Sequence, residues 1–324
     1  MTAGRLVYLF HHRPKGLVKK SIREGGPIEQ WKTERGRRDM EAAAWQLTSI
    51  SSRDKETKRQ RDGGSDLGGK PVEVQVLTGR KFWYQTAFCL YSFALASGRA
   101  VRAVVHDDGS LDKEQAEVLL RLFPGSRVET RDMIMERLDE LLPTSRFPTL
   151  RARRLELPLI KKITDIHLGR SGWRMFFDAD LLFFRRPEVL IDWWDDPLVP
   201  LTSVDAAYAY GYSMELLNEI AGQPVYDFIN TGLLGLKSDS IDWDKIEHWC
   251  RTLIERAGTD YYQEQALVAL QLAGSERVVL PQQDYLVYPR GEEAAACSAV
   301  MHHYVDLSKK SYFRDNWRRF VKQP

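Results

Sequence analysis

The sequence lacks long apolar runs and has few cysteines. None of its runs approaches the roughly 18 apolar residues of a membrane-spanning helix, and LVYLF at residues 6–10 is too short for the core of a signal peptide. The three cysteines, Cys89, Cys250 and Cys297, are far apart and show no metal-ligand spacing, which fits a compartment that keeps thiols reduced. We therefore expect a cytoplasmic protein whose cysteines are packing residues.

Glycine motifs that cradle phosphates are also missing. The turn after the first predicted strand contains neither G-x-G-x-x-G nor G-x-x-x-x-G-K-S. A dinucleotide-binding Rossmann domain and a Walker-type ATPase are therefore not supported, because both use such glycines to bring backbone N–H groups against a phosphate. No internal repeat is found either.

Charges of both signs are present but unevenly placed. The 324 residues carry a net charge of +2, yet residues 13–70 hold fifteen Lys or Arg against nine Asp or Glu. Because Arg5 adds one further positive charge, residues 71–324 have a net charge of −5. A basic arm thus precedes a mildly acidic body. Such an arm can attract nucleic acid or anionic lipid, although scattered charges of both signs are more often a solvated surface.

The arm divides into a helical part and a linker. Pro27 as a first-turn residue, acidic Glu29 and apolar residues at helical intervals predict a helix over about residues 27–48. Residues 51–70 are rich in charge and poor in apolar side chains, which predicts a flexible linker. We therefore expect an N-terminal extension over residues 1–70 and a folded domain over residues 71–324 that ends in a C-terminal lid or tail.

Residues 71–124 alternate between strand and helix patterns. PVEVQVLTG and RAVRAVVHDDG predict strands, and KFWYQTAFCLYSFALAS and LDKEQAEVLLRLFP predict the helices that follow them. Strand, helix, strand, helix with short turns is typical of right-handed β-α-β units around a parallel sheet. The predicted fold class is α/β.

Two aspartates stand inside the apolar segment WRMFFDADLLFFRRP at residues 173–187. Its first half predicts a buried strand, and Asp178 and Asp180 follow at the carboxyl end. In an extended chain, residues i and i+2 point to the same side. The two carboxylates therefore converge at the edge of the sheet where open α/β proteins bind ligands. The alternative for so short a motif is a turn in which the aspartates bond their own backbone amides.

Four segments, in their order along the chain, resemble the GT-A glycosyltransferases, most nearly those of glycosyltransferase family 8. They are Asp178-Ala179-Asp180, FINTGLLGL at 228–236, QEQAL at 263–267 and HHYVDLSKK at 302–310. The resemblance runs from about Val72 to Phe313. It implies the Rossmann-like GT-A fold, with a mixed, mainly parallel sheet flanked by helices. It also implies a transferase that moves a sugar from a nucleotide-diphosphate sugar, with UDP favoured, and retains the anomeric configuration.

The resemblance further implies a metal site. Asp178, Asp180 and His303 would bind a divalent cation, and Lys309, six residues after the histidine, would contact the diphosphate. We expect manganese, with magnesium as the alternative, because an imidazole ligand favours the later metals. Apart from any family, a cation and a lysine neutralise charge that develops on a departing diphosphate. In an extended segment His302 would point away from the site that His303 faces.

Other residues are assigned to the donor by the same resemblance. Asn230, Glu264 and Gln265 would lie beside the reacting carbon, where Glu264 would stabilise an oxocarbenium-like transition state or orient the acceptor hydroxyl. The remaining donor contacts would be Leu77, Thr78, Gly79, Lys162, Asp165, Thr231 and Gly232. A solvated helix surface explains Lys162 and Asp165 about as well. Asp107 and Asp108 would touch the nucleotide or simply form a turn.

The closing segment departs from the family pattern. Asp306 stands where the family has glycine, three residues after the histidine, and KKS replaces KPW. We therefore expect a closing loop of different shape. The residues before the first strand have no counterpart in the minimal fold, and the acceptor, whether a glycan, a lipid or a small molecule, is left open.

Two other functions compete with the transferase. Haloacid-dehalogenase-like phosphatases also begin with D-x-D after an apolar strand, but they continue with threonine near the N-terminus, whereas Leu181 and Leu182 follow here in mid-chain. A non-enzymatic binding module would use the basic arm and the aromatic and basic tail at residues 312–319. Such a module has no need of two buried aspartates that face one point. The same tail would allow peripheral contact of an enzyme with a membrane, and we expect no nucleic-acid partner.

Overall fold

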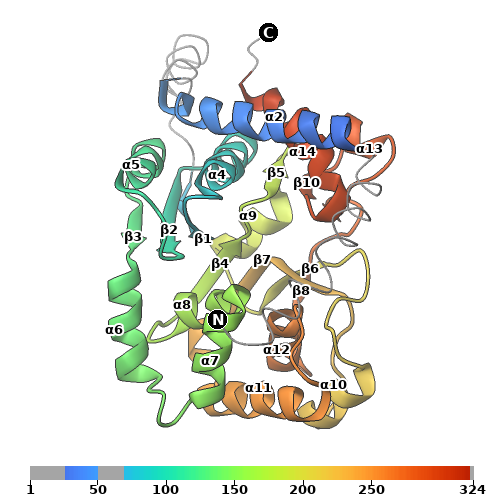
Figure 1. Cartoon of the computed structure of the whole chain (residues 1–324). Helices are drawn as coiled ribbons and strands as arrows, with labels where there is room; N and C mark the ends of the chain where they lie inside the picture. The colour runs from blue at the N-terminus through green and yellow to red at the C-terminus, as the bar shows by residue number, and fades with distance from the viewer. Residues whose placement is uncertain (1–25, 50–68, 322–324) are drawn as a thin grey trace.

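The computed structural model describes residues 26–49 and 69–321. Its centre is a seven-stranded sheet in the order β3-β2-β1-β4-β7-β6-β8 (Figure 1). These strands are β1 (Val72–Thr78), β2 (Val101–Asp107), β3 (Arg127–Glu129), β4 (Trp173–Phe177), β6 (Leu201–Val204), β7 (Ile229–Lys237) and β8 (Val278–Val279). Neighbouring strands are parallel except at β7, which runs antiparallel to β4 and β6. The predicted α/β class with a mainly parallel sheet is confirmed.

A second, three-stranded sheet has the order β5-β10-β9. Its strands are β5 (Leu181–Phe183), β9 (Tyr285–Val287) and β10 (Met301–His303). β10 pairs antiparallel with β5 and parallel with β9, and His303 lies opposite Leu181. Because β5 begins directly after Asp180, this pairing brings the C-terminal part of the chain against the two aspartates.

Helices cover both faces of the large sheet. They are α4 (Trp83–Ser97), α5 (Lys113–Leu122), α6 (Arg131–Leu141), α7 (Pro148–Glu156), α8 (Lys161–His167), α9 (Glu188–Asp195), α10 (Met214–Ala221), α11 (Trp243–Ala257) and α12 (Gln263–Leu272), with the short α13 (Glu293–Ala296) and α14 (Lys309–Arg314). Single 3-10 turns are η1 (Pro158–Ile160), η2 (Ser238–Ser240), η3 (Asp306–Ser308) and η4 (Asn316–Phe320). Within the described part of the chain, no helix has the length and apolarity needed to cross a membrane.

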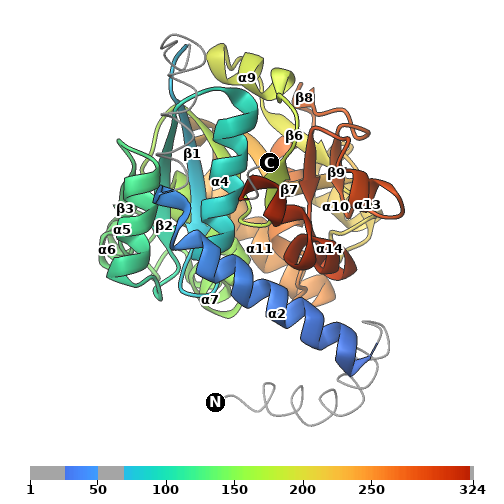
Figure 2. The ribbon, with the colours of Figure 1, turned by 90° about the horizontal axis from the view of Figure 1, so that it is seen from above.

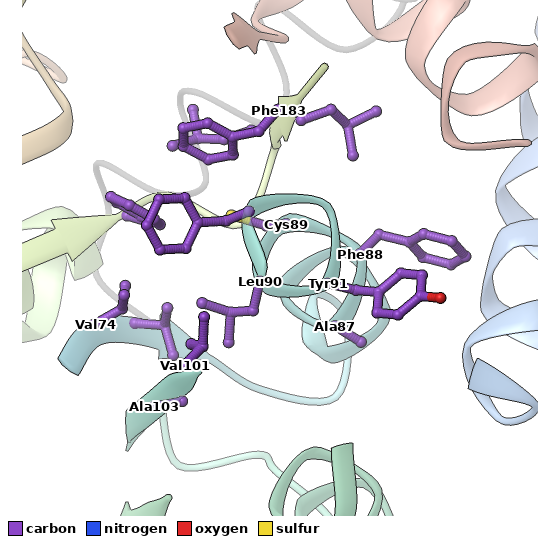
Figure 3. Close-up of a cluster of buried hydrophobic side chains, with 14 of the residues drawn as sticks. Val74, Ala87, Phe88, Cys89, Leu90, Tyr91, Val101, Ala103 and Phe183 are labelled. Atoms are coloured by element: carbon purple, nitrogen blue, oxygen red, sulfur yellow. The ribbon is translucent and has the colours of Figure 1, made fainter. Parts of the chain in front are cut away.

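The sheet separates two hydrophobic cores. Leu233 of β7 belongs to the core that includes α4 and α5, and its neighbour Leu234 belongs to the core formed with α6 to α8 and α10 to α12. Adjacent residues of a strand point to opposite faces, so the two cores lie on opposite sides of the sheet. Figure 3 shows the first core, in which Cys89 and Leu90 of α4 pack close to Val74 and Val101 of the sheet. Burial raises the pKa of the Cys89 thiol, which fits a packing residue.

Helix α2 (Pro27–Ala44) lies within the region where the sequence predicts a helix. It packs against α4 and α14 (Figures 1 and 2). Met40, Ala44 and Leu47 are fully buried and belong to the same core as α4. The predicted linker over residues 51–70 lies outside the described residues except for Gly69 and Lys70. That residues 71–324 form a domain able to fold without residues 1–70 therefore stays a prediction.

Substitution of Met40 tests whether α2 is part of the folded core. Met40→Ala removes a fully buried side chain and should lower the free energy of unfolding by about 2–5 kcal/mol. Trp31→Ala on the same helix, at a side chain that is 59% exposed, should change it by less than about 1 kcal/mol. Denaturant unfolding measures both. An unchanged stability of Met40→Ala would show that α2 does not pack on the core in solution.

Candidate active site

Asp178, Asp180 and His303 form a cluster that fits a divalent cation. Their nearest ligand atoms all lie within 4.8 Å of one another. His303 Nε2 lies 3.3 Å from Asp180 Oδ1 and 3.7 Å from Asp178 Oδ2. The backbone fixes this arrangement, since the Asp178 amide donates to the Gly232 carbonyl at 2.7 Å and the Tyr304 amide donates to the Asp180 carbonyl at 3.0 Å. Two carboxylates and an imidazole are a ligand set that a divalent cation accepts.

The imidazole of His303 is oriented from β7. Its Nδ1 lies 3.1 Å from Asn230 Oδ1, which also accepts the Gly232 amide at 3.0 Å. Because that amide oxygen can only accept, Nδ1 donates to it, and Nε2 is the ring atom that faces the carboxylates and would bind a metal. Gly232 leaves room for the ring: a Cβ there would lie 2.2 Å from His303 Cε1. The family resemblance implies that Gly232 contacts the donor. The structure adds a reason why a larger residue does not fit at this position.

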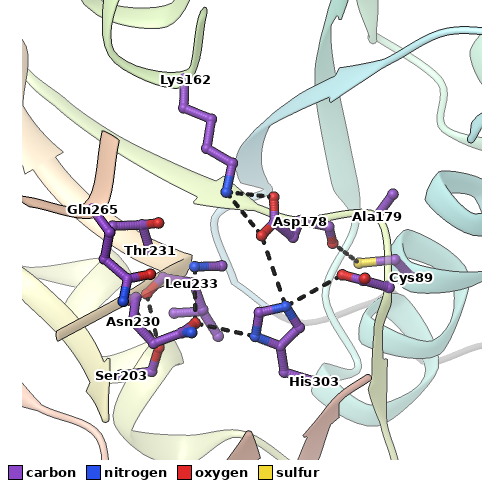
Figure 4. A network of polar contacts seen from close by, with 12 residues as sticks. Cys89, Lys162, Asp178, Ala179, Ser203, Asn230, Thr231, Leu233, Gln265 and His303 are labelled. Carbon is purple, nitrogen blue, oxygen red and sulfur yellow. Dashed lines mark hydrogen bonds and ion pairs between the residues drawn. The ribbon is translucent and has the colours of Figure 1, made fainter. Parts of the chain in front are cut away.

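Each aspartate has its own lysine. Lys162 Nζ lies 2.8 Å and 2.9 Å from the two carboxylate oxygens of Asp178, as Figure 4 shows. Lys309 Nζ lies 3.0 Å from Asp180 Oδ2. Burial alone would lower the pKa of Lys162, but Asp178, Glu264 and Asp180 together outweigh burial and raise that pKa. Burial would likewise raise the pKa of Asp180, whereas Lys309 and His303 hold it below its ordinary value.

Asp205, at the end of β6, joins two residues that the sequence assigns to the donor. Its Oδ2 accepts from Asn230 Nδ2 at 2.9 Å and from Gln265 Nε2 at 3.0 Å. Gln265 Nε2 also donates to the Ala209 carbonyl at 2.9 Å. Asp205 belongs to no recognisable motif, and the sequence does not predict its role. The available signal was its place directly after LTSV, a short segment that ends in a β-branched residue.

Glu264 is a buried carboxyl group beside the lysine and aspartate pair. Its Oε2 accepts from Thr231 Oγ1 at 2.9 Å. Its Oε1 is buried and has no hydrogen-bond partner among residues 26–49 and 69–321. Burial raises the pKa of Glu264 to about 7, although Lys162 and the Thr231 hydroxyl act in the opposite direction. An orphaned buried oxygen with a pKa near neutrality is typical of a functional site.

Comparisons with known proteins bear on the fold. No protein-family model matches the chain, and no curated protein does. The bifunctional glycosyltransferase WbbM aligns with a TM-score of 0.50 and 12% identity over 80% of this chain and 52% of that one. The galactosyltransferase LgtC, solved with donor and acceptor sugar analogues, aligns with a TM-score of 0.50 and 12% identity over 77% of this chain and 94% of that one. The chain has the GT-A fold.

Mouse xyloside xylosyltransferase 1 is also similar, with a TM-score of 0.48 and 11% identity over 72% of this chain and 98% of that one. Identities this low concern the fold. β1 and β4 are parallel, so their carboxyl ends lie at one edge of the sheet, where Thr78 ends β1 and Asp178 follows β4. Contact of the predicted donor residues with a nucleotide sugar stays a prediction.

Asp165, which the resemblance assigns to the donor, forms an ion pair elsewhere in the structure. Both carboxylate oxygens of Asp165 are held at 2.6 Å by the guanidinium of Arg154. Asp165 is fully buried in that ion pair, and the structure does not bring it to the metal cluster. Lys162, one turn earlier on α8, does reach the cluster. The plain helix-surface alternative does not describe either side chain, because both are buried.

The residues after β1 and β2 form one tight corner. Leu77 and Thr78 end β1, and the Asp108 amide donates to the Thr78 carbonyl at 2.9 Å. A Cβ on Gly79 would lie 2.0 Å from the Asp108 carboxylate. Asp107 accepts three backbone amides of the turn, from residues 109, 110 and 111. Asp107 and Asp108 thus form the turn that was the alternative to contact with the nucleotide. Contact of residues 77–79 with the nucleotide stays a prediction.

In the closing segment, residues 302–310, a left-handed backbone conformation occurs at Asp306, where the family has glycine. Asp306 adopts a φ of 48°, in the left-handed region that glycine and, less readily, aspartate occupy. Asp306 therefore adopts, with some strain, the backbone conformation that glycine would adopt easily.

His302, the neighbour of His303, contacts Glu293 at 2.9 Å and the Tyr304 hydroxyl at 3.0 Å. It belongs to the packing behind the site and not to the metal cluster.

The raised pKa of Glu264 predicts a dependence of stability on pH. The folded protein holds this proton up to about pH 7, whereas the unfolded chain releases it near the ordinary value of 4.5. Between these values the native state binds more protons, so stability falls as pH rises, by about 3 kcal/mol in total. Glu264→Gln should remove that decline. Unfolding of the metal-free proteins at pH 4.5 to 8 measures it, and parallel pH profiles would contradict the assignment.

Proposed function

We propose that this protein is a metal-dependent glycosyltransferase that uses a nucleotide-diphosphate sugar. The observation that carries the proposal is the cluster of Asp178, Asp180 and His303 at the carboxyl edge of a GT-A sheet. A lysine beside each aspartate adds positive charge next to the place where a diphosphate would bind. On the resemblance to family 8 we favour a UDP sugar and retention of configuration.

The residues divide the chemistry among them. Asp178, Asp180 and His303 would hold manganese, which when bound neutralises negative charge on the departing diphosphate. Lys309, whose side chain is 39% exposed, would turn from Asp180 to the phosphate oxygens. Its pKa is raised by the Asp180 carboxylate, so the side chain is a cation at neutral pH. No residue needs to change protonation for this step.

The sugar would lie against β7 and α12. Asn230 and Gln265 are fixed through Asp205, so their amide groups are preorganised for hydroxyl groups of the donor. Glu264, with one oxygen free of hydrogen bonds among the described residues, would orient the acceptor hydroxyl or stabilise positive charge at the reacting carbon. Thr231 and Gly232 position this glutamate and the metal-binding imidazole, respectively.

The phosphatase alternative makes a different demand on the residues after Asp180. Such a phosphatase continues D-x-D with a threonine, whereas Leu181 and Leu182 follow here and form the buried strand β5. The transferase is therefore the better explanation of the geometry. Turnover of p-nitrophenyl phosphate without turnover of any nucleotide sugar would reverse this choice.

Metal dependence is tested by turnover. We expect UDP, GDP, CDP or ADP sugars, screened by calorimetry with manganese, to include one that binds, and chelation to abolish its turnover. Asp180→Asn and His303→Ala should each lower turnover by at least about 100-fold with the fold retained. His302→Ala is the matched control and should cost stability but leave the manganese titration unchanged. Full activity in excess chelator would contradict the proposal.

The tail at residues 312–319 does not offer the exposed aromatic surface that the sequence suggests, because Tyr312, Phe313 and Trp317 are buried. The outer face of α2 instead supports peripheral contact with an anionic membrane. Ile28, Trp31, Arg35 and Arg38 recur at helical spacing, and Ile28 and Trp31 are 70% and 59% exposed. Exposed aromatic and basic side chains on one helix face suit a lipid headgroup region. We expect flotation with anionic but not neutral vesicles, and its loss in Ile28→Ser/Trp31→Ala. Equal flotation of the variant and the unmodified protein would contradict this contact.

A further inference from the structure

The helix that carries Lys309 is too short to be stable by itself. α14 has six residues, about half the length at which isolated helices become even marginally stable. Its position must therefore come from packing on its neighbours. On one side the buried Tyr312 reaches the metal site, where its hydroxyl donates to the Ala179 carbonyl at 3.4 Å, between the two aspartates.

On its other side α14 packs against α2 (Figures 1 and 2). The two backbones lie against each other at Gly36, in the middle of α2. A Cβ at this position would lie 2.2 Å from the Phe313 carbonyl oxygen and 2.9 Å from its carbon. The atoms that it would meet are backbone, which cannot rotate away. A larger residue at 36 must therefore push the two helices apart.

Arg314, the last residue of α14, stabilises the contact between α14 and α2. Its guanidinium donates to the Thr33 hydroxyl at 2.9 Å and 2.7 Å, and to both the carboxylate and the backbone carbonyl of Glu29. The planar guanidinium bonds several acceptors in a fixed geometry that an ammonium group does not reproduce. A second pair follows on η4, where Arg318 contacts Asp39 at 2.7 Å.

α2 is in turn anchored to the main core. Met40 and Ala44, one and two turns beyond Gly36, are fully buried among residues of that core. Contacts therefore run from the core through α2 to the backbone of α14, and from α14 to Lys309. α14 is held between α2 and the loop that carries Asp178 and Asp180.

We propose that α2 is a positioning element for the active site, which holds Lys309 at the distance from Asp180 at which it can receive a diphosphate. This inference rests on the proposed function. It assigns Gly36 and Arg314, which touch no proposed substrate, to the placement of the phosphate-binding lysine. Lysine has a long and mobile side chain, so fixing its backbone lowers the entropy lost when its ammonium group binds phosphate.

A double-mutant cycle separates positioning from general stability. The probes are inorganic pyrophosphate and UDP, each with manganese, and their dissociation constants are measured by calorimetry on the full chain. Gly36→Ala should weaken binding by about tenfold, in the range of one charge-assisted hydrogen bond. In the Lys309→Ala background the same substitution should change binding by less than about twofold, because its effect acts through that lysine.

Arg314→Met provides a second variant should Gly36→Ala fold poorly. It should behave in the same way, and Arg314→Lys should restore only part of the affinity. Arg38→Ala, on the outer side of α2 with its side chain 75% exposed, is the matched control and should bind as the unmodified protein does. Thermal unfolding of each variant, recorded in parallel, confirms that the binding measurements compare folded proteins.

Three results overturn the inference and can be told apart. If Gly36→Ala or Arg314→Met weakens binding equally with and without Lys309, α2 stabilises the protein but does not position the lysine, and the proposed function stands. If the unmodified protein binds neither pyrophosphate nor UDP with manganese, the proposed function fails and this inference fails with it. Unchanged binding in both variants would also overturn the inference.

Discussion

The site depends on the balance of charge around two carboxylates that lie next to an apolar core. Asp178 and Asp180 follow a buried strand, where an unpaired carboxylate is strongly destabilising. Lys162 and Lys309 each pair with one of them, and His303 lies against both. In the proposed transferase a cation and a diphosphate would take over these pairings, so the side chains that stabilise the two carboxylates are also those that a bound donor would need.

This balance constrains elements far apart in the chain. The antiparallel pairing of β5 with β10 brings His303 beside the aspartates, and β7 orients its ring through Asn230. The requirement for glycine at position 232 follows from that ring. Each contact restricts the next, so the imidazole is preorganised for metal before any metal binds.

Both the buried glutamate and the N-terminal helix are explained by the same site. The pKa of Glu264 rises to about 7 through burial. Burying an ionisable carboxyl group destabilises a protein, and groups with such shifted pKa values cluster at functional sites. α2, outside the segment that resembles family 8, packs on the helix that begins with Lys309. The described part of the extension, residues 26–49, therefore lies against the helix that carries Lys309, whether or not residues 71–324 fold alone.

Local sequence patterns determined the fold class and part of the site. Alternating valines and helical spacings predicted the β-α-β units, because side-chain periodicity follows directly from backbone geometry. The D-x-D spacing placed Asp178 and Asp180 on one side of a strand end for the same reason. The family resemblance supplied His303 and Lys309, which no local pattern links to residues more than 100 positions earlier.

Tertiary structure decided the rest. The resemblance assigned Asp165 to the donor together with Lys162, but Asp165 is buried in an ion pair with Arg154. Asp205 had no motif, since its importance lies in two amides that reach it from β7 and α12. Burial, pairing across long stretches of chain and the close contact of α2 with α14 depend on three-dimensional packing, and residue order alone does not encode these distances.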